Sequence, residues 1–419
     1  MRILVVGGGG REHAIVRKLR ESPRVSELFC APGNGGISRD AQCIAVQASD
    51  IDGMVAFSRQ NKMDLVFVAP DDPLAAGMVD ALERAGIRAF GPRANAAQIE
   101  SSKVFSKHLM KKYGIPTAGY EVFSDPRAAL DFIRKQGKYP AVIKADGLAL
   151  GKGVIIAADF AEAEAGIRTI MKDKVFGASG NRVVIEEFLT GPEVSVLAFT
   201  DGKTMKPMVS SKDHKRALDG NLGPNTGGMG TISPNPYYTP ELAETCRKTI
   251  FLPTMNAMNE EGRTFRGCLY FGLMLTPDGP KVIEYNSRFG DPETQVVLPR
   301  LKTDFVDILE AVVDGRLADQ PVEWDDSACA CVVMASGGYP GKYAKGLEIT
   351  GLDAGGQLEG VTVYHAGTAY RDGKFYTNGG RVLGVTALGG DLSEALEKAY
   401  AGVSRIHFEG AHYRRDIGR

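Results

Sequence analysis

Four consecutive glycines directly follow the first apolar segment of this 419-residue chain. Residues 3–6 are isoleucine, leucine and two valines, which is a composition typical of a buried strand. The next residues predict a helix over 12–19, so the glycines lie between the end of a strand and the start of a helix. Free amide groups and the helix dipole favour a phosphate at such a place. This feature predicts a parallel sheet with a ligand loop at its edge.

Strand-like and helical segments continue to alternate over the first hundred residues. Apolar runs at 28–31, 65–69 and 89–91 predict further strands, and the periodicity of 74–85 predicts a helix. This βαβ alternation indicates a parallel sheet with helices on its faces. A helix predicted over 97–113 begins the next unit.

The middle of the chain has a different pattern. Strand, glycine-rich turn, strand, helix and strand follow one another between 139 and 189, which indicates an α+β unit on an antiparallel sheet. The segment 211–236 is rich in glycine and proline and is too long for an ordinary connection, so it is predicted to be a functional loop. Thr239 and Pro240 then predict the start of a helix that runs toward Gly262 and bends at Pro253.

The last ninety residues predict a small mixed unit. Strands are expected at 329–335, 361–366 and 382–388, and a helix at 392–403 with Asp391 or Ser393 as its cap.

Charge and composition exclude several classes of protein. Fifty Lys and Arg residues against 51 Asp and Glu give a formal charge of −1, so the chain lacks the basic surplus of proteins that bind nucleic acid or membrane surfaces. No apolar run reaches the roughly 18 residues of a membrane span. The six cysteines contain no CxxC pair, and no zinc site or disulfide framework is readable. A cytoplasmic protein is expected.

The opening glycine loop has three possible interpretations. A dinucleotide fold fits imperfectly, because Glu12 occupies the third glycine position of GxGxxG and the residues after the second strand supply no acid for a ribose. The phosphate of a smaller ligand, held by the glycine amides with Arg11 or the 33–36 loop, is favoured. A tight turn that binds nothing is the remaining alternative, and His13 is expected to be structural.

A second glycine-rich segment lies between the strands at 140–145 and 154–157. It differs from a Walker A loop, because Gly151 and Lys152 are followed by glycine and a strand rather than by Ser or Thr and a helix. Such a segment can close over a triphosphate as a flap, with Lys144 and Lys152 toward its oxygens. The alternative is that its lysines form a solvated rim.

Acidic residues mark two later strands. Glu186 and Glu187 end an apolar strand, where an adenine amino group and a ribose diol would supply donors; a charged surface end is the alternative. Glu284, Asn286 and Arg288 share one face of another strand. A carboxylate and an amide oxygen are suited to Mg²⁺ or Mn²⁺, and Arg288 to a carboxylate substrate, although a plain amphipathic edge strand shows the same alternation.

Taken in order, these segments resemble the ATP-grasp ligases, and most closely the glycinamide ribonucleotide synthetase family. The strings that carry the resemblance are Gly9-Gly10-Arg11-Glu12-His13-Ala14, Pro32-Gly33-Asn34-Gly35-Gly36, Lys144-Ala145-Asp146-Gly147, Gly151-Lys152-Gly153, Asp213-His214-Lys215-Arg216, Gly223-Pro224-Asn225-Thr226-Gly227-Gly228-Met229-Gly230 and Glu284-Tyr285-Asn286-Ser287-Arg288-Phe289-Gly290-Asp291-Pro292-Glu293-Thr294-Gln295. The chain departs from the family at Asp71, where a glutamate is usual.

The resemblance implies a multidomain fold of α/β and α+β parts. It consists of an N-terminal Rossmann-like domain (1–101), an ATP-grasp domain (102–318) with a glycine-rich flap subdomain (about 119–190), and a small β-rich C-terminal domain (325–419). The implied reaction joins glycine to 5-phosphoribosylamine with ATP as co-substrate and Mg²⁺ or Mn²⁺ as cofactor, in purine biosynthesis. No obligatory protein partner, nucleic acid or membrane is implied.

The resemblance also implies the site residues. The ATP-binding residues would be Lys103, Lys144, Gly147, Gly151, Lys152, Gly153, Glu186, Glu187, Leu189 and Glu193. The substrate residues would be Gly9, Gly10, Arg11, Asn34, Gly35, Asn225, Thr226, Gly228, Met229, Asp291, Pro292 and Glu293. Arg288, Asp213 and Lys215 would be catalytic, and Glu284 and Asn286 would bind the metal.

Other functions would leave different signs in the sequence. A carboxylase or formate-using ligase of the same pathway is disfavoured by the strings at 213–216 and 227–230. An NAD-dependent oxidoreductase rests only on the first glycine loop and predicts no ATP turnover. A sensor that had lost catalysis would lack one of the key side chains, yet Glu284, Asn286, Lys144 and Lys152 are all present.

Overall fold

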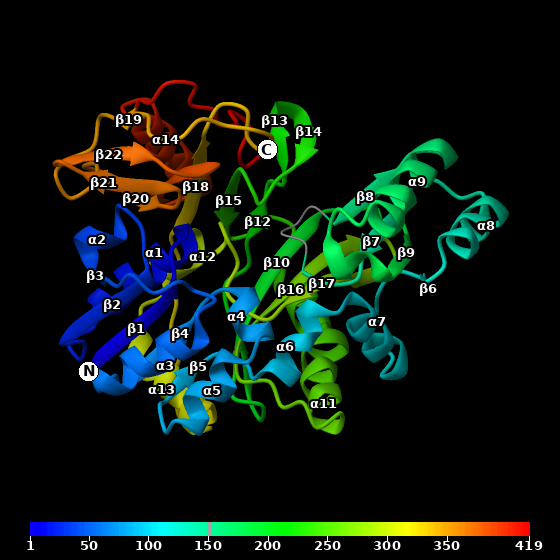
Figure 1. Ribbon diagram of the computed structural model, residues 1–419, viewed down its shortest axis with the longest axis horizontal. Coiled ribbons are helices and arrows are strands. Elements are labelled where there is room, and N and C mark those ends of the chain that lie inside the picture. The colour runs from blue at the N-terminus through cyan, green and yellow to red at the C-terminus, as the bar shows by residue number, and fades with distance from the viewer. Residues whose placement is uncertain (149–152) are drawn as a thin grey trace.

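The computed structural model describes residues 1–148 and 153–419 (Figure 1). The opening strand β1 (Arg2–Gly7) lies at the centre of a five-stranded sheet, between β2 (Glu27–Pro32) and β4 (Leu65–Val68). Short strands β3 (Gln42–Cys43) and β5 (Ala89–Phe90) form its edges, and every pairing is parallel. The predicted N-terminal parallel sheet is confirmed. The helices that accompany it are α1 (Gly10–Arg20), α2 (Ile37–Asp40), α3 (Ile51–Gln60), α4 (Asp71–Ala75) and α5 (Met78–Arg84).

Two predicted helices are each divided in the structure. The helix expected over 74–85 is broken between α4 and α5 at Gly77, whose φ of +89° is left-handed. The helix expected over 97–113 consists of α6 (Ala94–Ser101) and α7 (Lys103–Lys112). Ser102 between them is extended, and its hydroxyl accepts a hydrogen bond from Phe105 N. A local side-chain cap therefore restarts the helix, which periodicity alone does not show.

The middle part of the chain forms two antiparallel four-stranded sheets. The first has the order β6 (Tyr120–Phe123), β9 (Val183–Glu187), β7 (Ala141–Ala145) and β8 (Val154–Ala157). Helices α8 (Pro126–Gln136) and α9 (Phe160–Ile167) pack against it. The second is the helix predicted for this α+β unit, whereas α8 was not predicted.

The second sheet has the order β11 (Met205–Pro207), β10 (Glu193–Thr200), β16 (Gly267–Thr276) and β17 (Gly279–Asn286). The predicted helix after Thr239 forms as α10 (Pro240–Cys246), a π-helical turn (Arg247–Phe251) and α11 (Leu252–Glu260), so the irregular turn lies directly before Pro253. Helices α12 (Thr294–Val297) and α13 (Phe305–Asp314) follow the sheet.

The third large sheet joins the middle of the chain to its last part. Its order is β12 (Lys212–Asp213), β15 (Gly230–Ser233), β18 (Ala328–Ala335), β23 (Arg381–Gly389) and β20 (Thr362–His365). Helix α14 (Leu392–Val403) contributes to the same core, and its cap is Asp391, which accepts from Glu394 N. A smaller sheet contains β19 (Glu348–Ile349), β22 (Lys374–Thr377) and β21 (Thr368–Arg371).

The segment 211–236, predicted to be a functional loop, contains short strands that the sequence analysis did not predict. This segment contains β12, the hairpin of β13 (Arg216–Leu218) and β14 (Leu222–Asn225), and β15. Strand β15 is held by β18, with Thr231 opposite Cys331. The partner strand lies about a hundred residues further along the chain, so the local composition does not reveal this pairing.

Four phenylalanines connect the N-terminal sheet to the central part. Phe67 comes from β4, Phe199 from β10, Phe289 from the segment after β17 and Phe305 from α13. The ring centroid of Phe289 lies 5.9, 6.0 and 6.1 Å from those of Phe67, Phe199 and Phe305, and all four are buried. Through Phe289, this cluster anchors the segment that follows β17.

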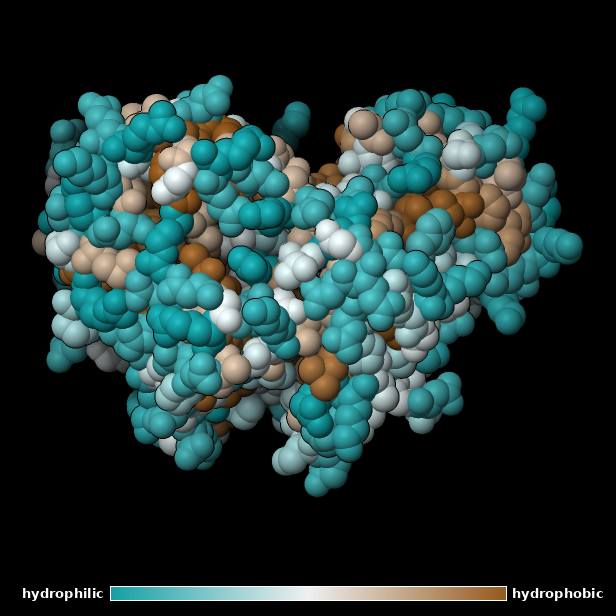
Figure 2. Space-filling view, turned by 90° about the horizontal axis from the view of Figure 1, so that it is seen from below, coloured by the Kyte–Doolittle hydropathy of each residue, from teal (hydrophilic) through white to brown (hydrophobic). Residues whose placement is uncertain are grey.

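The face seen in Figure 2 is mostly hydrophilic, with apolar residues in separate groups. The lobe that carries α8 and α9 is set off from the rest by a notch. None of the helices formed by the described residues has both the length and the apolar character that a bilayer crossing needs.

Removing one ring of the phenylalanine cluster tests its contribution. Phe305→Ala is expected to lower the free energy of unfolding by about 3–5 kcal/mol, because it leaves a cavity among three other rings. Urea denaturation followed by fluorescence and circular dichroism measures the change. Val175→Ala, at a side chain that is 64% exposed, is the control. Equal midpoints for the two variants would contradict the assignment.

Candidate active site

Glu284 lies near the end of β17 among three lysines that come from different elements. Lys215 Nζ is 3.4 Å from Glu284 Oε1, and Lys103 and Lys144 lie near enough to act on its charge. Chiefly because of Lys215, the pKa of Glu284 falls to about 2. Glu284 in turn raises the pKa of Lys215 well above its usual range. Both groups are therefore charged at neutral pH.

Lys144 on β7 connects the two central sheets. Its Nζ donates to Ile283 O of β17 at 3.0 Å and lies 3.1 Å from Glu186 Oε1 on β9. Glu186 Oε2 is 2.9 Å from Lys107 Nζ, and all three side chains are buried. Burial lowers the pKa of Lys107 to about 8. Here Glu186, expected at adenine or ribose, lies between two ammonium groups.

Asn286 is the last residue of β17, and Arg288 follows in the segment after the strand, so the prediction that Arg288 lies on the strand with Glu284 is wrong. Arg288 Nη2 donates to Asn286 Oδ1 at 3.1 Å and lies 2.9 Å from Glu100 Oε1. Glu100 also accepts from the backbone and hydroxyl of Ser287. Although burial opposes the charged form, Glu100 and Asp71 raise the pKa of Arg288. Among the described residues, the buried Arg288 Nε has no hydrogen-bond partner.

The loop between β12 and β15 brings Asp213 and Lys215 to the site. Thr226 folds back on it, since its N and Oγ1 both donate to Lys215 O, at 2.8 and 2.9 Å. Gly228 has a φ of +116°, and a Cβ there would lie 2.6 Å from Asp213 Oδ1 and 2.5 Å from Pro292 Cδ, so the backbone approaches closely. Burial raises the pKa of Asp213 well above its usual range, and neighbouring Glu293 adds to the effect.

Arg381 of β23 ties this loop to the segment after β17. Its Nη1 donates to Gly227 O at 2.7 Å and to Asp291 O at 2.8 Å, and its Nη2 is 3.2 Å from Asp291 Oδ2. Despite burial, Arg381 lowers the pKa of Asp291. Glu293 Oε1 accepts from Tyr270 OH at 3.2 Å.

The two N-terminal glycine loops reach the same segment. Arg11 Nη1 donates to Phe289 O at 3.0 Å. Gly9 N already donates to Glu12 Oε2 at 2.6 Å, so this amide has a partner within the chain. Asn34 Nδ2 donates to Gly8 O and His365 O, and Gly35 N donates to Thr368 O, which fixes the second loop against the C-terminal part.

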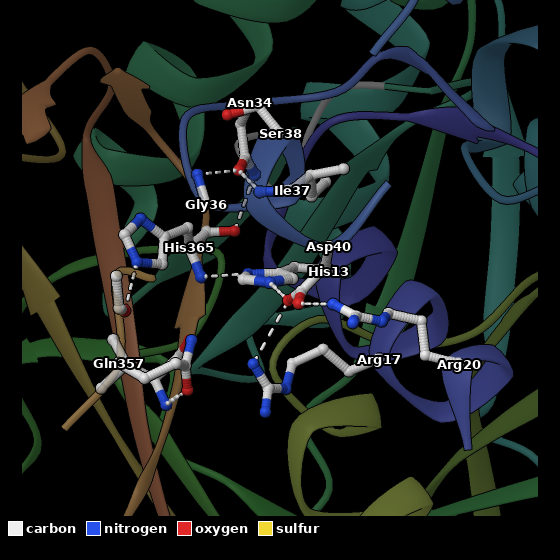
Figure 3. A network of polar contacts seen from close by, with 12 residues as sticks. His13, Arg17, Arg20, Asn34, Gly36, Ile37, Ser38, Asp40, Gln357 and His365 are labelled. Carbon is white, nitrogen blue, oxygen red and sulfur yellow. Dashed lines mark hydrogen bonds and ion pairs between the residues drawn. The ribbon is translucent and has the colours of Figure 1, made fainter. Parts of the chain in front are cut away.

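His13 stands behind these loops in a buried network (Figure 3). Its Nδ1 accepts from His365 N at 2.7 Å, so Nε2 carries the proton and donates to Asp40 Oδ2 at 2.9 Å. Asp40 also pairs with Arg17 and Arg20. The prediction that His13 is structural agrees with this geometry.

The remaining predicted residues lie around this centre at different depths. Gly147 O accepts from Lys103 Nζ at 2.8 Å, and Gly153 O accepts from Ala145 N. Glu187 is exposed and lies 3.5 Å from Lys281, whereas Glu193 is 3.6 Å from Lys215. Gly10 begins α1, Met229 is buried, and Leu189 and Asn225 are half-buried. Gly151 and Lys152 lie outside the described residues.

Several residues of the centre were not predicted from the sequence. Lys107 stands four residues after Lys103, so its i, i+4 position on one helix face was an available signal. No such sequence signal exists for Glu100, Tyr270 or Arg381, because the tertiary fold brings each of them to the site.

Glu284 and Asn286 are residues that could hold a divalent cation. The first is an ionised carboxylate and the second presents an amide oxygen, which are the hard ligands that Mg²⁺ prefers. Within residues 1–148 and 153–419, no three His, Cys, Asp or Glu side chains form a complete metal cage. This donor set suits an ion that completes its shell with phosphate oxygens and water.

Two facing antiparallel sheets, with lysines on one and an acidic, amide-bearing strand on the other, define an ATP-grasp protein. The fold is shared with the biotin carboxylase–β,γ-ATP complex from Campylobacter jejuni, at 14% identity and a TM-score of 0.76, over 98% of this chain and 92% of that one. Three protein-family models match this chain. They are the phosphoribosylglycinamide synthetase N domain over residues 1–100, the ATP-grasp (A) domain over 101–294 and the C domain over 329–419. The chain belongs to the phosphoribosylglycinamide synthetase family.

Full-length relatives agree with this assignment. A phosphoribosylamine–glycine ligase from Caldanaerobacter subterraneus is 49% identical over 417 residues, which cover 100% of this chain and 99% of the relative. The crystal structure of the phosphoribosylamine–glycine ligase from Thermotoga maritima has a TM-score of 0.87 at 36% identity, with both chains fully covered. The chicken trifunctional purine biosynthetic protein adenosine-3 is 52% identical, and the match covers 42% of that longer protein.

Three buried neutral histidines predict a loss of stability in mild acid. Burial lowers the pKa of His13, that of His214 to about 4 and that of His365 to about 3. The unfolded chain therefore binds more protons below about pH 6.5. The free energy of unfolding falls as the pH drops from 7.5 to 5.5, by at most ~1.4 kcal/mol for each histidine, because only about one pH unit of this range lies below 6.5. Urea midpoints measure this, and His13→Asn should reduce the fall.

The exposed His407 provides the control. His407→Asn is expected to keep the pH dependence of the unmodified protein. If His13→Asn also keeps it in full, His13 is not one of the residues responsible.

Proposed function

We propose that this protein uses ATP to join glycine to 5-phosphoribosylamine, giving glycinamide ribonucleotide, ADP and phosphate in purine biosynthesis. The observation that carries the proposal is the convergence of three parts on residues 284–293. Lys215 of the 213–230 loop meets Glu284, Arg11 of the first glycine loop meets Phe289, and Arg381 joins Asp291 to Gly227. An ATP site, a loop for an activated carboxylate and a phosphate-binding loop are thereby adjacent.

The reaction requires activation of glycine. A carboxylate anion is a poor electrophile with a poor leaving group, so an amine does not attack it. In the proposed first step a glycine carboxylate oxygen attacks the γ-phosphorus of ATP, which forms glycyl phosphate and releases ADP. The amine nitrogen then attacks the carbonyl carbon, phosphate leaves with the C–O bond electrons, and the nitrogen loses a proton. Alignment and charge neutralisation are the protein's main contributions.

The lysine-rich side of the centre suits the nucleotide. Lys103 and Lys144 would bind phosphate oxygens together with the amides around Gly147 and Gly153, and Gly151 and Lys152 would complete the flap. Glu186, Glu187, Leu189 and Glu193 would surround adenine and ribose. Because Glu186 pairs with Lys107 and Lys144, its role there would include holding Lys144 in position.

The other side of the centre suits glycine and its acyl phosphate. Arg288 has a buried Nε free to donate among the described residues, and a carboxylate is its natural partner. Asp213, Lys215 and the residues from Asn225 to Met229 would enclose the intermediate and exclude water, which would otherwise hydrolyse it. Asp291, Pro292 and Glu293 would form the opposite wall.

The phosphoribosyl group would bind at the N-terminal loops. Arg11 is the cationic side chain of this region, beside Gly9, Gly10, Asn34 and Gly35. Asn34 would act by fixing its loop, because its amide group already bonds within the chain.

A divalent cation held by Glu284 and Asn286 would neutralise charge between phosphate oxygens. Mg²⁺ and Mn²⁺ both suit these ligands. We further propose the domain division 1–101, 102–318 with a flap subdomain at about 119–190, and 325–419. A cytoplasmic location and independence from any obligatory protein partner are also part of the proposal.

Release of ADP tests the function. The purified protein is incubated with ATP, Mg²⁺, glycine and freshly prepared phosphoribosylamine, and each component is omitted in turn. ADP formation that requires the full set, with glycinamide ribonucleotide as product, is the expected result. Turnover with other acids or amines but not with these would overturn the substrate assignment, and a lack of turnover with any combination would overturn the proposal.

The role of Glu284 is tested by Glu284→Gln. The change preserves the size of the side chain but removes its charge, so turnover should fall by at least a hundredfold while the circular dichroism spectrum stays the same. Glu121→Gln, at an exposed residue of β6, is the matched control and should retain activity. Near-normal activity of Glu284→Gln would remove the metal assignment.

A further inference from the structure

Arg414 is among the largest fully buried side chains of the protein, with 1% exposure. Its Nε and Nη2 bind the two carboxylate oxygens of Asp416, both at 2.8 Å. Its Nη1 donates to Arg216 O at 3.2 Å and to Asn221 Oδ1 at 3.0 Å. A buried guanidinium therefore joins residues after α14 to the β13–β14 hairpin.

The same stretch makes further polar contacts with the hairpin. Asp416 Oδ2 accepts from Gly220 N at 2.8 Å, and Arg415 N donates to Asp219 Oδ1 at 2.7 Å. His412 Nε2 donates to Ala217 O at 2.7 Å. These contacts involve the turn that connects β13 to β14 and the backbone of β13.

His214 extends this junction to the loop that carries Asp213 and Lys215. Its Nε2 accepts from Gly418 N at 3.0 Å, so its proton is on Nδ1, which donates to Gly230 O at 3.1 Å. The imidazole is thus fixed on both sides, directly between two predicted catalytic residues.

The hairpin needs support from outside itself. An isolated two-stranded ribbon is only marginally stable, and the paired Leu218 and Leu222 at its tip are 47% and 64% exposed. An open pocket lined in part by Leu218, Ala411 and Tyr413 lies beside this junction. The polar contacts described above therefore supply support that the exposed leucines at the tip do not. Figure 1 shows the hairpin beside the C-terminal end of the chain.

We propose that residues 412–418 are a positioning element for the active site, which holds the β13–β14 hairpin and thereby Asp213, Lys215 and Thr226. Arg414 is its central positioning residue, and it acts through the loop rather than on a substrate. This inference rests on the proposed function, because the loop is the one expected to enclose glycyl phosphate.

The expected effect of loosening this element is leakage of the intermediate. Water that reaches glycyl phosphate attacks its carbonyl carbon, so that glycine and phosphate are regenerated after ADP has formed. Each such event consumes ATP without amide formation. The ratio of ADP to glycinamide ribonucleotide therefore reports how well the loop is held, whereas a general loss of folded protein lowers both products equally.

The experiment compares three variants in the full-length protein. Arg414→Met removes the guanidinium contacts. Asn221→Gly removes one acceptor of Arg414, and glycine tolerates the left-handed φ of +56° at this position. Arg415→Met, at an exposed side chain next to Arg414, is the control. ADP and glycinamide ribonucleotide are measured in the same samples, with thermal melting to establish folding and calorimetry to measure ATP binding.

The ratio is expected to be near one for the unmodified protein and for Arg415→Met. It should rise at least twofold in Arg414→Met and by a smaller factor in Asn221→Gly, with ATP affinity unchanged. A ratio near one in both folded variants would overturn the inference. If Arg414→Met fails to fold, the ratio measured for Asn221→Gly alone tests the inference. Absence of glycinamide ribonucleotide from the unmodified protein would instead contradict the proposed function.

Discussion

Mutual neutralisation of charge around Glu284 and Glu186 is the interaction on which the rest of the site depends. Removing an ion from water is costly unless an opposite charge lies close by. Glu284 meets this condition through Lys215, and Glu186 through Lys107 and Lys144. Each of these lysines comes from a different element, so the elements are held in one arrangement by the charges that the chemistry needs.

This dependence explains why loops from distant parts of the chain can be arranged before any substrate binds. Arg288 and Arg381 extend the same principle, because each neutralises a carboxylate and also donates to nearby oxygens. Arg288 donates to the side-chain amide oxygen of Asn286, and Arg381 donates to backbone carbonyls. The two arginines thus fix both the position of the loops they contact and the electrostatic potential between them. A preorganised site of this kind loses little free energy to reorganisation when charge develops during phosphoryl transfer.

Local patterns predicted the parts of the fold that depend on local forces. The strand and helix around the glycines, the cap at Asp391 and the shared face of Glu284 and Asn286 all follow from neighbouring residues. The division of helices at Gly77 and Ser102, the strand pairing of residues 230–233 and the lysine partners of Glu186 depend on torsions or contacts that no short window contains. The resemblance predicts which residues form the site, whereas their charge partners follow only from the tertiary fold.

The pairing of β15 with β18 has a consequence for how the protein is made. The segment that carries Asp213 and Lys215 is continued by β15, which is synthesised well before its partner strand β18 leaves the ribosome. Domains fold as units while synthesis proceeds, yet this part of the middle region cannot complete its sheet at that stage. This sheet, and with it the backbone that carries Asp213, can therefore form only after residues 328–335 have been synthesised.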